Sequence, residues 1–177
     1  KEEWGIFRFV EEIKKISPKL VAMEVSAPSI THDLQTAELL KKETGCKVAF
    51  IGPHATYDHE NLIGYYNFID YCIRDEFEFT LLELYKSLDH VNDVSQIDGI
   101  TFRDNNQIKV NAGRPFSSDL TVFPFPDRED FKIEDYQQAF FGGKKTALMV
   151  SNSSNSFKHI YTPHLSSPPI PVCSYVV

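Results

Sequence analysis

Three short apolar runs, each followed by a polar loop and then by a helix-like pattern, constrain the fold of this chain more than any other feature. The loops cover residues 26–29, 52–56 and 74–78. In a parallel α/β sheet, successive strand-to-helix loops emerge at the same edge, so these three loops would line one crevice at the carboxyl ends of the strands. The pattern therefore predicts a ligand-binding edge, with a bound cofactor as the first hypothesis.

The apolar periodicity around these loops alternates between the strand type and the helix type. Apolar residues at helical spacing, with charged residues opposite them, predict helices. Short runs that are apolar on both faces predict parallel strands, and residues 20–25 have the character of a central strand. The predicted strands are 20–25, 47–51 and 69–73, and the predicted helices are 5–16, 31–44, 61–66 and 79–88. This alternation implies right-handed crossovers and a parallel α/β sheet.

The character of the chain changes after residue 90. Two β-prone runs, 97–103 and 108–111, flank the polar residues 104–107, which predicts a hairpin with a four-residue loop. The proline-bearing segment 114–130 reads as an extended linker. A further strand is expected at 144–150, followed by a Ser-, Asn- and Pro-rich tail with little regular structure.

Charge, apolar run length and cysteine content argue against a nucleic-acid partner, a membrane span and a disulfide-bonded fold. The formal net charge is −7 and no basic stripe is present, which argues against a nucleic-acid partner. The apolar runs are far shorter than the roughly 20 residues that cross a bilayer, and the first residues do not resemble a signal peptide. Cys46, Cys72 and Cys173 are odd in number and widely spaced. This cysteine usage favours a reduced, cytoplasmic protein. The short apolar runs predict no membrane partner.

Five segments in order carry a resemblance to a known family. They are SPKLV at 17–21, GPHAT at 52–56, IDYCIR at 69–74, IDGITFR at 97–103 and FPFPDR at 123–128. Together they resemble the cobalamin-binding radical SAM enzymes, which include anaerobic magnesium-protoporphyrin monomethyl ester cyclases and many methyltransferases. The likeness runs from about residue 7 to residue 151. It implies a flavodoxin-like, Rossmann-like sheet that binds cobalamin and precedes a radical SAM barrel.

The resemblance also predicts how the chain is divided. A domain of this type would begin with a strand, a helix and a second strand before the helix at 5–16, so we expect a sheet that is incomplete at its N-terminus. The predicted divisions are a partial cobalamin-binding domain at 1–92, a hairpin and Pro-rich linker at 93–143, and the start of a degenerate barrel at 144–177.

The resemblance implies that the barrel chemistry is lost. Asn155, His159 and Thr162 stand where the family has the three cysteines that hold a 4Fe-4S cluster. Cluster iron needs thiolate ligands, so this chain is not expected to bind the cluster or to cleave S-adenosylmethionine. A degenerate gene, a frameshifted tail and a shortened chain all remain open as explanations. The Asp-x-His-x-x-Gly motif, which supplies a lower cobalt ligand in other cobalamin proteins, is absent, because Asp58 and His59 are adjacent. Radical SAM relatives often lack that histidine, so its absence is compatible with the resemblance.

The candidate cofactor-binding residues follow from the three loops and the resemblance. They are Ser26, Pro28, Ser29, Gly52, Pro53, His54, Arg74, Glu76 and Glu78. By resemblance, Ser26 would donate its hydroxyl to the nucleotide tail of cobalamin, and Gly52 would let the backbone approach the flat ligand. A turn serine, a turn glycine and a solvated histidine are the plain alternatives.

The third loop departs from the family form Arg-Gly-Glu-Gly-Glu. Asp75 and Phe77 replace its two glycines, and either side chain would intrude if this loop passed close to the corrin. His54, Asp58, His59 and Glu60 lie in one segment without the spacing of known zinc sites, so no metal site is expected there.

These observations predict cobalamin binding as part of a cobalamin-dependent radical SAM enzyme, where the intact relative performs methyl transfer or radical cyclisation or rearrangement. Whether this chain is itself an enzyme stays open, because the cluster cysteines and most of the barrel are absent. One alternative is a non-catalytic module that binds a nucleotide-like ligand or a protein partner. The other is an inactive remnant whose exposed sheet edge favours association.

Overall fold

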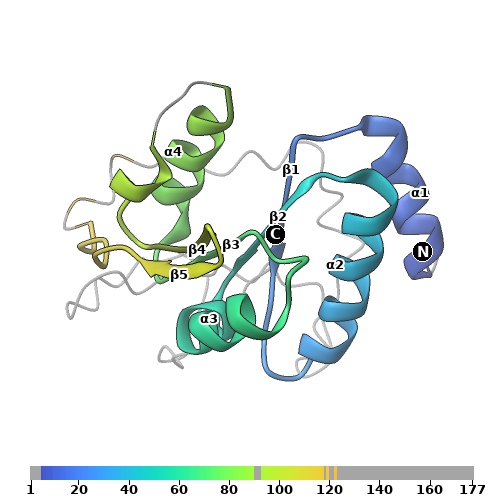
Figure 1. Ribbon diagram of the computed structural model, residues 1–177, viewed down its shortest axis with the longest axis horizontal. Helices are drawn as coiled ribbons and strands as arrows, with labels where there is room; N and C mark the ends of the chain where they lie inside the picture. Colours follow the sequence, from blue (N-terminus) through green and yellow to red (C-terminus); the bar gives the residue numbers. More distant parts are fainter. Residues whose placement is uncertain (1–4, 90–92, 118, 120–121, 123–177) are drawn as a thin grey trace, which may run out of the picture. The chain divides into compact units, whose positions relative to one another are not determined.

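The computed structural model describes residues 5–89, 93–117, 119 and 122, and it divides the chain into two compact units, Lys1–Pro115 and Phe116–Val177. All the regular elements described below lie in the first unit (Figure 1). Four helices, α1 (Ile6–Ile16), α2 (Ile30–Thr44), α3 (Pro53–Tyr65) and α4 (Phe77–Asp89), accompany five strands, β1 (Leu20–Glu24), β2 (Lys47–Ile51), β3 (Tyr71–Ile73), β4 (Ile100–Asp104) and β5 (Gln107–Val110). A short 3-10 helix spans Val94–Gln96.

The strands form one sheet in the order β1-β2-β3-β4-β5. Strands β1, β2 and β3 are parallel, with Ala22 opposite Ala49 and Ala49 opposite Tyr71. Strand β4 runs antiparallel to β3, and β5 runs antiparallel to β4. The predicted α/β fold, with parallel strands followed by a β-hairpin, is confirmed.

The hairpin and the first strand differ from the prediction in detail. The turn between β4 and β5 has two residues, Asn105 and Asn106, rather than four. Both have positive φ, 44° and 67°, which is the conformation that a tight type I′ turn requires and that asparagine tolerates. Strand β1 is an edge strand within the described sheet, not a central one, and Ala22 on it is exposed.

Helix α3 is the largest correction to the predicted elements. Residues 52–56 were expected to form a loop, with a short helix at 61–66, but one helix runs from Pro53 to Tyr65 with a kink at Asp58, where φ is −115° and ψ is 22°. Gly52 is the N-cap residue and Pro53 occupies the first turn, where its fixed φ favours a helix and its missing N–H costs nothing. Helix α4 likewise begins at Phe77, two residues earlier than predicted.

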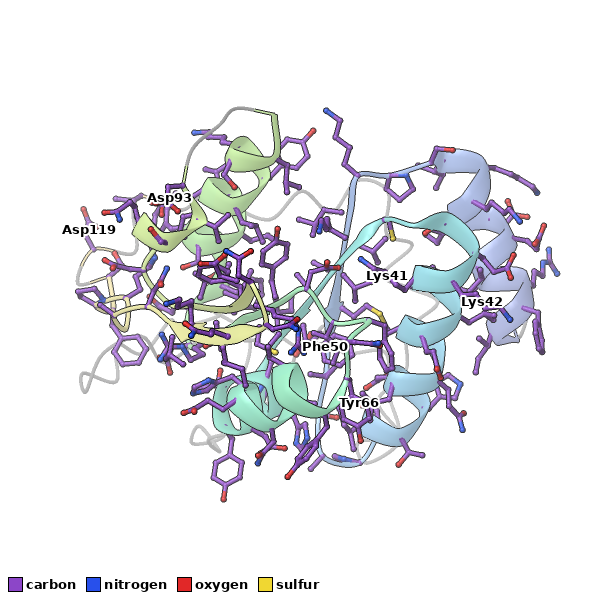
Figure 2. All side chains as sticks on the ribbon, viewed as in Figure 1. Lys41, Lys42, Phe50, Tyr66, Asp93 and Asp119 are labelled. Carbon is purple, nitrogen blue, oxygen red and sulfur yellow. The ribbon has the colours of Figure 1, made fainter. Side chains whose placement is uncertain are left out.

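Apolar residues are buried on both faces of the sheet. One core cluster joins Phe50 and Val48 to residues of α2 and α3, including Leu62 and Ile63. The other joins Ile73 and Ile100 to α4 through Leu84. Figure 2 shows Phe50 inside the protein near the middle of the sheet, whereas Lys42 is exposed on α2. Burial on both faces explains why the β2 sequence is almost entirely apolar.

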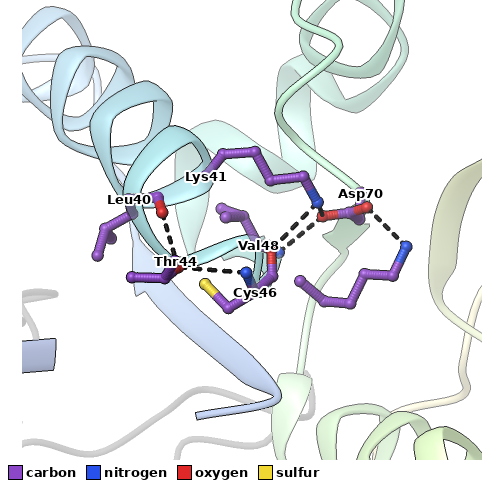
Figure 3. Close-up of polar contacts among 7 residues, drawn as sticks. Leu40, Lys41, Thr44, Cys46, Val48 and Asp70 are labelled. Carbon is purple, nitrogen blue, oxygen red and sulfur yellow. Dashed lines mark hydrogen bonds and ion pairs between the residues drawn. The ribbon is translucent and has the colours of Figure 1, made fainter. Parts of the chain in front are cut away.

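An ionic cluster ties α2 to the amino ends of β2 and β3 (Figure 3). The Asp70 carboxylate accepts hydrogen bonds from Lys41 Nζ at 2.6 Å, Lys47 Nζ at 3.0 Å and the Val48 backbone N–H at 2.8 Å. The Asp70 backbone N–H donates to the Val48 carbonyl at 2.9 Å. Together with the bond from the Val48 N–H to the Asp70 carboxylate, it continues the β2–β3 hydrogen bonding beyond the end of β3. The hydrogen bond to Asp70 raises the pKa of Lys47.

Within the described residues, no helix is both long and apolar enough to cross a membrane. The predicted strand at 144–150, nearly all of the linker, Cys173 and the positions of Asn155, His159 and Thr162 lie outside the described residues.

Replacing Asp70 tests the ionic cluster. We expect Asp70→Ala to lower the free energy of unfolding by about 2 kcal/mol, because the buried Val48 N–H and two lysines lose their acceptor. Urea denaturation followed by circular dichroism measures this change. Glu43→Gln is the control, since Glu43 pairs with Lys14 at 3.2 Å in an exposed position, where the change should stay within about 0.5 kcal/mol. Equal losses in the two variants would contradict the assignment.

Candidate functional site

The three polar loops lie together at the carboxyl edge of β1, β2 and β3. The Val25 N–H donates to the Ile51 carbonyl at 2.9 Å, and the His54 N–H donates to the Val25 carbonyl at 3.2 Å. The Asp75 N–H donates to Thr56 Oγ1 at 2.8 Å. The first loop is thus tied to the second and the second to the third, as the parallel arrangement predicted; their ligand-binding roles stay predictions.

Gly52 is required by the packing of the edge itself. Its φ is +90°, and a Cβ at this position would lie 2.9 Å from Glu24 Cγ and 3.2 Å from the Val25 carbonyl oxygen. No side chain fits there without displacement. The sequence prediction assigned Gly52 to close ligand approach, but its close neighbours in the structure belong to the end of β1.

Glu24 is a residue of this edge that sequence reasoning missed. It is the last residue of β1, it pairs with Ile51 of β2, and its side chain contacts the space beside Gly52. Burial raises the pKa of its carboxyl group above the ordinary value. One feature of the sequence could have indicated Glu24: it is the single acidic residue in the otherwise apolar run from Leu20 to Val25.

The first loop contains a chain of hydroxyl contacts that ends on a carboxylate. Ser26 Oγ lies 2.9 Å from Ser29 Oγ, and Ser29 Oγ donates to Asp33 Oδ2 at 2.6 Å. All three side chains are partly exposed. Asp33 lies in the first turn of α2 and was also missed, although a Ser-x-x-x-Asp spacing at a helix start places the two side chains one helical turn apart. Pro28, between the two serines, is exposed.

The two histidines of α3 have different partners. His54 Nε2 lies 3.9 Å from Asp58 Oδ2, one turn along the helix. His59 Nδ1 lies 3.0 Å from Thr101 Oγ1 of β4. Burial lowers the pKa of His59, and the nearby positive charge of Arg74 lowers it further. Within the described residues, no group of three or more His, Cys, Asp or Glu side chains could hold a metal ion.

The Arg74 guanidinium contacts the residues that follow β5 of the hairpin. Its guanidinium donates to the Asn111 and Ala112 carbonyl oxygens, and its backbone N–H donates to the Gly99 carbonyl at 2.8 Å. Its Nε atom is buried without a hydrogen-bond partner among the described atoms. Arg74 therefore links the third loop to the end of β5.

The two replacements in the third loop have structural explanations. Asp75 has a φ of 60°, the left-handed conformation that glycine favours and that aspartate tolerates better than most residues. Phe77 begins α4 and packs against the core cluster that contains Ile73 and Leu84. Its ring therefore contributes to the protein core. Glu78 is exposed in the first turn of α4, where an acid favours the helix dipole, and Glu76 is partly buried just before that helix.

Two shallow depressions lie away from this edge. One is lined by residues that include Lys47, Asn67, Tyr71 and Arg103, at the amino end of β3. The other lies beside the 3-10 helix and the hairpin, around Phe102. Neither includes a residue of the three loops.

Comparison with known proteins confirms the predicted resemblance. The chain is 26% identical over 144 residues to the anaerobic magnesium-protoporphyrin IX monomethyl ester cyclase of Synechocystis sp., covering 79% of this chain and 28% of that protein. It is 25% identical over 127 residues to an uncharacterized methyltransferase of Pyrococcus horikoshii, covering 71% of this chain and 28% of that protein. The chain thus spans about a quarter of the length of these curated relatives. No family model matches.

Solved structures of cobalamin-dependent radical SAM enzymes share the fold. The enzyme OxsB, with aqua-cobalamin and S-adenosylmethionine bound, matches with a TM-score of 0.56 and 17% identity over 62% of this chain and 16% of that one. The methyltransferase TsrM from Kitasatospora setae, with cobalamin and a [4Fe-4S] cluster bound, matches with a TM-score of 0.51 and 17% identity over 65% of this chain and 21% of that one. At this identity the likeness establishes the fold alone.

A substitution at Gly52 tests the packing of the edge. We expect Gly52→Ala to lower the free energy of unfolding by about 3 kcal/mol, because it adds backbone strain at positive φ and an overlap with Glu24 and Val25. Chemical denaturation measures the loss. Gly113→Ala is the matched control, because a Cβ there meets nothing within 4 Å. A tolerated Gly52→Ala would show that β1 and β2 do not approach as described.

The lowered pKa of His59 predicts a pH dependence of stability. Neutral His59 stabilises the fold above its ordinary pKa of 6.5, and this contribution is lost as the pH falls through the lowered folded-state value. We therefore expect His59→Gln to reduce the loss of unfolding free energy between about pH 7 and about pH 5. The exposed His32 provides the control variant, His32→Gln. An unchanged pH profile for His59→Gln would exclude burial of a neutral imidazole.

Proposed function

We propose that this chain binds cobalamin at the carboxyl edge of β1, β2 and β3, as the cobalamin-binding part of a cobalamin-dependent radical SAM enzyme. The observation that carries the proposal is that hydrogen bonds connect the three loops to one another at one edge of the sheet. Ligands of open parallel sheets bind in the crevice outside the carboxyl ends of the strands. The fold shared with OxsB, whose structure contains aqua-cobalamin, supports cobalamin as that ligand.

The loop residues fit a large, flat ligand. The first loop offers the Ser26 and Ser29 hydroxyls together with the exposed Pro28. At the third loop, the Phe77 ring is partly buried and packs against a core cluster. Asp75 keeps a conformation typical of glycine, so the backbone course of a glycine-containing loop is retained. The Phe77 replacement is thus compatible with corrin binding, whereas the Asp75 side chain is exposed on the loop.

The chain's own residues would bind and orient the cofactor. Ser26, Ser29 and His54 supply polar groups at the first two loops, Gly52 and Pro53 hold the second loop against β1, and Arg74 holds the third loop to the hairpin. Glu76 and Glu78 follow in the third loop. When bound, cobalamin supplies the methyl-transfer or radical chemistry of its cobalt centre.

The proposal is limited to the part of the relatives that this chain covers. Because the chain spans 28% of the curated relatives, a catalytic activity would need the rest of such a protein. Thiolate ligands are replaced at Asn155, His159 and Thr162, so we propose that the 4Fe-4S cluster and S-adenosylmethionine are not bound by this chain.

The cysteines support a reducing, cytoplasmic location within this proposal. Cys46 and Cys72 are buried and unpaired with each other. Burial raises the pKa of Cys72 to about 12, so its thiol stays protonated and unreactive. Such cysteines are typical of proteins that do not depend on disulfides.

A cobalamin titration tests the proposed function. We expect hydroxocobalamin to change its visible absorbance on binding and to co-elute with the chain in gel filtration at about one equivalent. Ala27→Trp, which places a bulky ring on the exposed first loop, should abolish co-elution. Gln107→Trp, on the exposed face of β5, should retain it. A folded chain that retains no corrin would contradict the proposal and favour a different ligand or an inactive remnant.

A further inference from the structure

The outer side of β1 carries backbone groups that no described residue satisfies. The hydrogen bonds that continue the β1–β2 pairing beyond both ends of β1 use odd-numbered residues, the Lys19 carbonyl and the Val25 N–H, at 2.9 Å each. Successive residues of a strand direct their backbone N–H and C=O groups to opposite sides, so all the odd-numbered residues face β2. The N–H and C=O groups of Leu20, Ala22 and Glu24 therefore point away from the sheet.

This edge lacks the features that usually protect a free strand. Natural proteins cover such an edge or place lysine, proline or a bulge on it. Within the described residues β1 has none of these, its single charge is at its end, on Glu24, and its central residue, Ala22, is exposed. The free stretch ends at Pro18, which has no N–H, and at Ser26, whose N–H lies 3.4 Å from Ser29 Oγ. The available groups are thus centred on Ala22 and suit an added strand.

Helix α1 has an apolar face that the described residues leave largely uncovered. Phe9, Val10, Ile13 and Ile16 share this face through their spacing of three and four residues. Val10 is buried, whereas Ile16 is 71% exposed. Helix α1 packs against α2, and Figure 1 shows it on the far side of α2 from α3. Residues 17–19 alone connect α1 to β1, so the uncovered helix face and the free strand edge occur at the same margin of the sheet.

We propose that β1 pairs antiparallel with β1 of a second copy of this chain, in a register centred on Ala22. Ala22 then lies opposite Ala22 of the second copy, and Leu20 lies opposite Glu24, so each outward N–H meets an outward C=O. Twofold symmetry about an axis perpendicular to the sheet keeps both α1 helices on the same face. Their uncovered apolar faces meet above the joined strands. This inference goes beyond cobalamin binding and does not depend on it.

The distribution of charge favours a second copy in this antiparallel order. Lys41 and Lys47 share the single carboxylate of Asp70 at the amino ends of β2 and β3, which leaves an excess positive charge there. Leu20 pairs with Lys47 within each chain. Because Glu24 of one copy lies opposite Leu20 of the other, it comes within two strand spacings, about 10 Å, of this positive end. A parallel order would instead place two Glu24 side chains next to each other.

Sedimentation velocity of the full chain without cobalamin tests this pairing. We expect the wild-type chain to form a dimer of twice its 20.3 kDa mass as its concentration is raised. Ala22→Lys and Ala22→Glu each place like charges directly opposite one another, so either variant alone should raise the dimer dissociation constant at least about tenfold. An equimolar mixture of the two should restore the dimer, because opposite charges then face each other. This restoration is specific to a register with Ala22 opposite itself.

Val110→Lys is the matched control, at the other edge of the sheet. Val110 lies on β5 and is 44% exposed. The Asn111 N–H donates to the Ile100 carbonyl at 3.0 Å, so the backbone groups of Val110 also point away from the sheet. This variant should dimerise like the wild-type chain. Ile16→Lys alters α1 and leaves β1 unchanged, and it should weaken the dimer at least about tenfold through the loss of apolar contact.

Circular dichroism establishes that each variant is folded, and Ile16→Lys decides the test if the Ala22 variants do not fold. A wild-type chain that stays monomeric at every concentration, whether its edge is free or covered by another part of the chain, overturns the inference. A mixture of the Ala22 variants that stays monomeric, loss of the dimer in Val110→Lys, or its full retention in Ile16→Lys also overturns it. Because none of these readouts involves cobalamin, they decide the inference even if the proposed function fails.

Discussion

The close approach of β1 and β2 at their carboxyl ends is the constraint on which the whole candidate edge depends. Gly52 lies against Glu24 and Val25 with no room for a Cβ, and its positive φ turns the chain directly into α3. Because α3 starts at Pro53, Thr56 stands one turn along it and accepts the Asp75 N–H of the third loop. One glycine position thus determines where the second loop ends and how the third is held.

The two ends of the parallel strands have opposite chemical roles. At the amino end, Asp70 gathers two lysines and a backbone amide, so its charge is compensated within the protein. At the carboxyl end, the serine hydroxyls and Asp33 remain partly exposed and are paired mainly with one another. Paired, compensated charges stabilise the fold, whereas polar groups with remaining hydrogen-bonding capacity are available to a ligand. This contrast supports the proposal that a ligand binds at the carboxyl edge of the sheet.

Much of this fold could be predicted from the sequence, because apolar periodicity reports local structure. The strand at Lys47–Ile51 was predicted to the residue, and α1 and α2 to within one residue at their start. The prediction was wrong at α3, because Gly-Pro is common in turns and equally suited to a helix start. The partners of Arg74 could not be predicted, since Asn111 lies 37 residues away and meets it only after β4 and β5 have joined the sheet.

The fold alone does not decide which ligand the carboxyl edge would bind. A parallel sheet with helix N-termini at its carboxyl edge suits phosphates, nucleotides and corrins alike, so the fold is weak support for any one of them. Asp33 changes this balance by placing a carboxylate in the first turn of α2, where it accepts a hydrogen bond from Ser29 Oγ. A phosphate bound directly at this loop would meet the negative charge of Asp33, which opposes its binding.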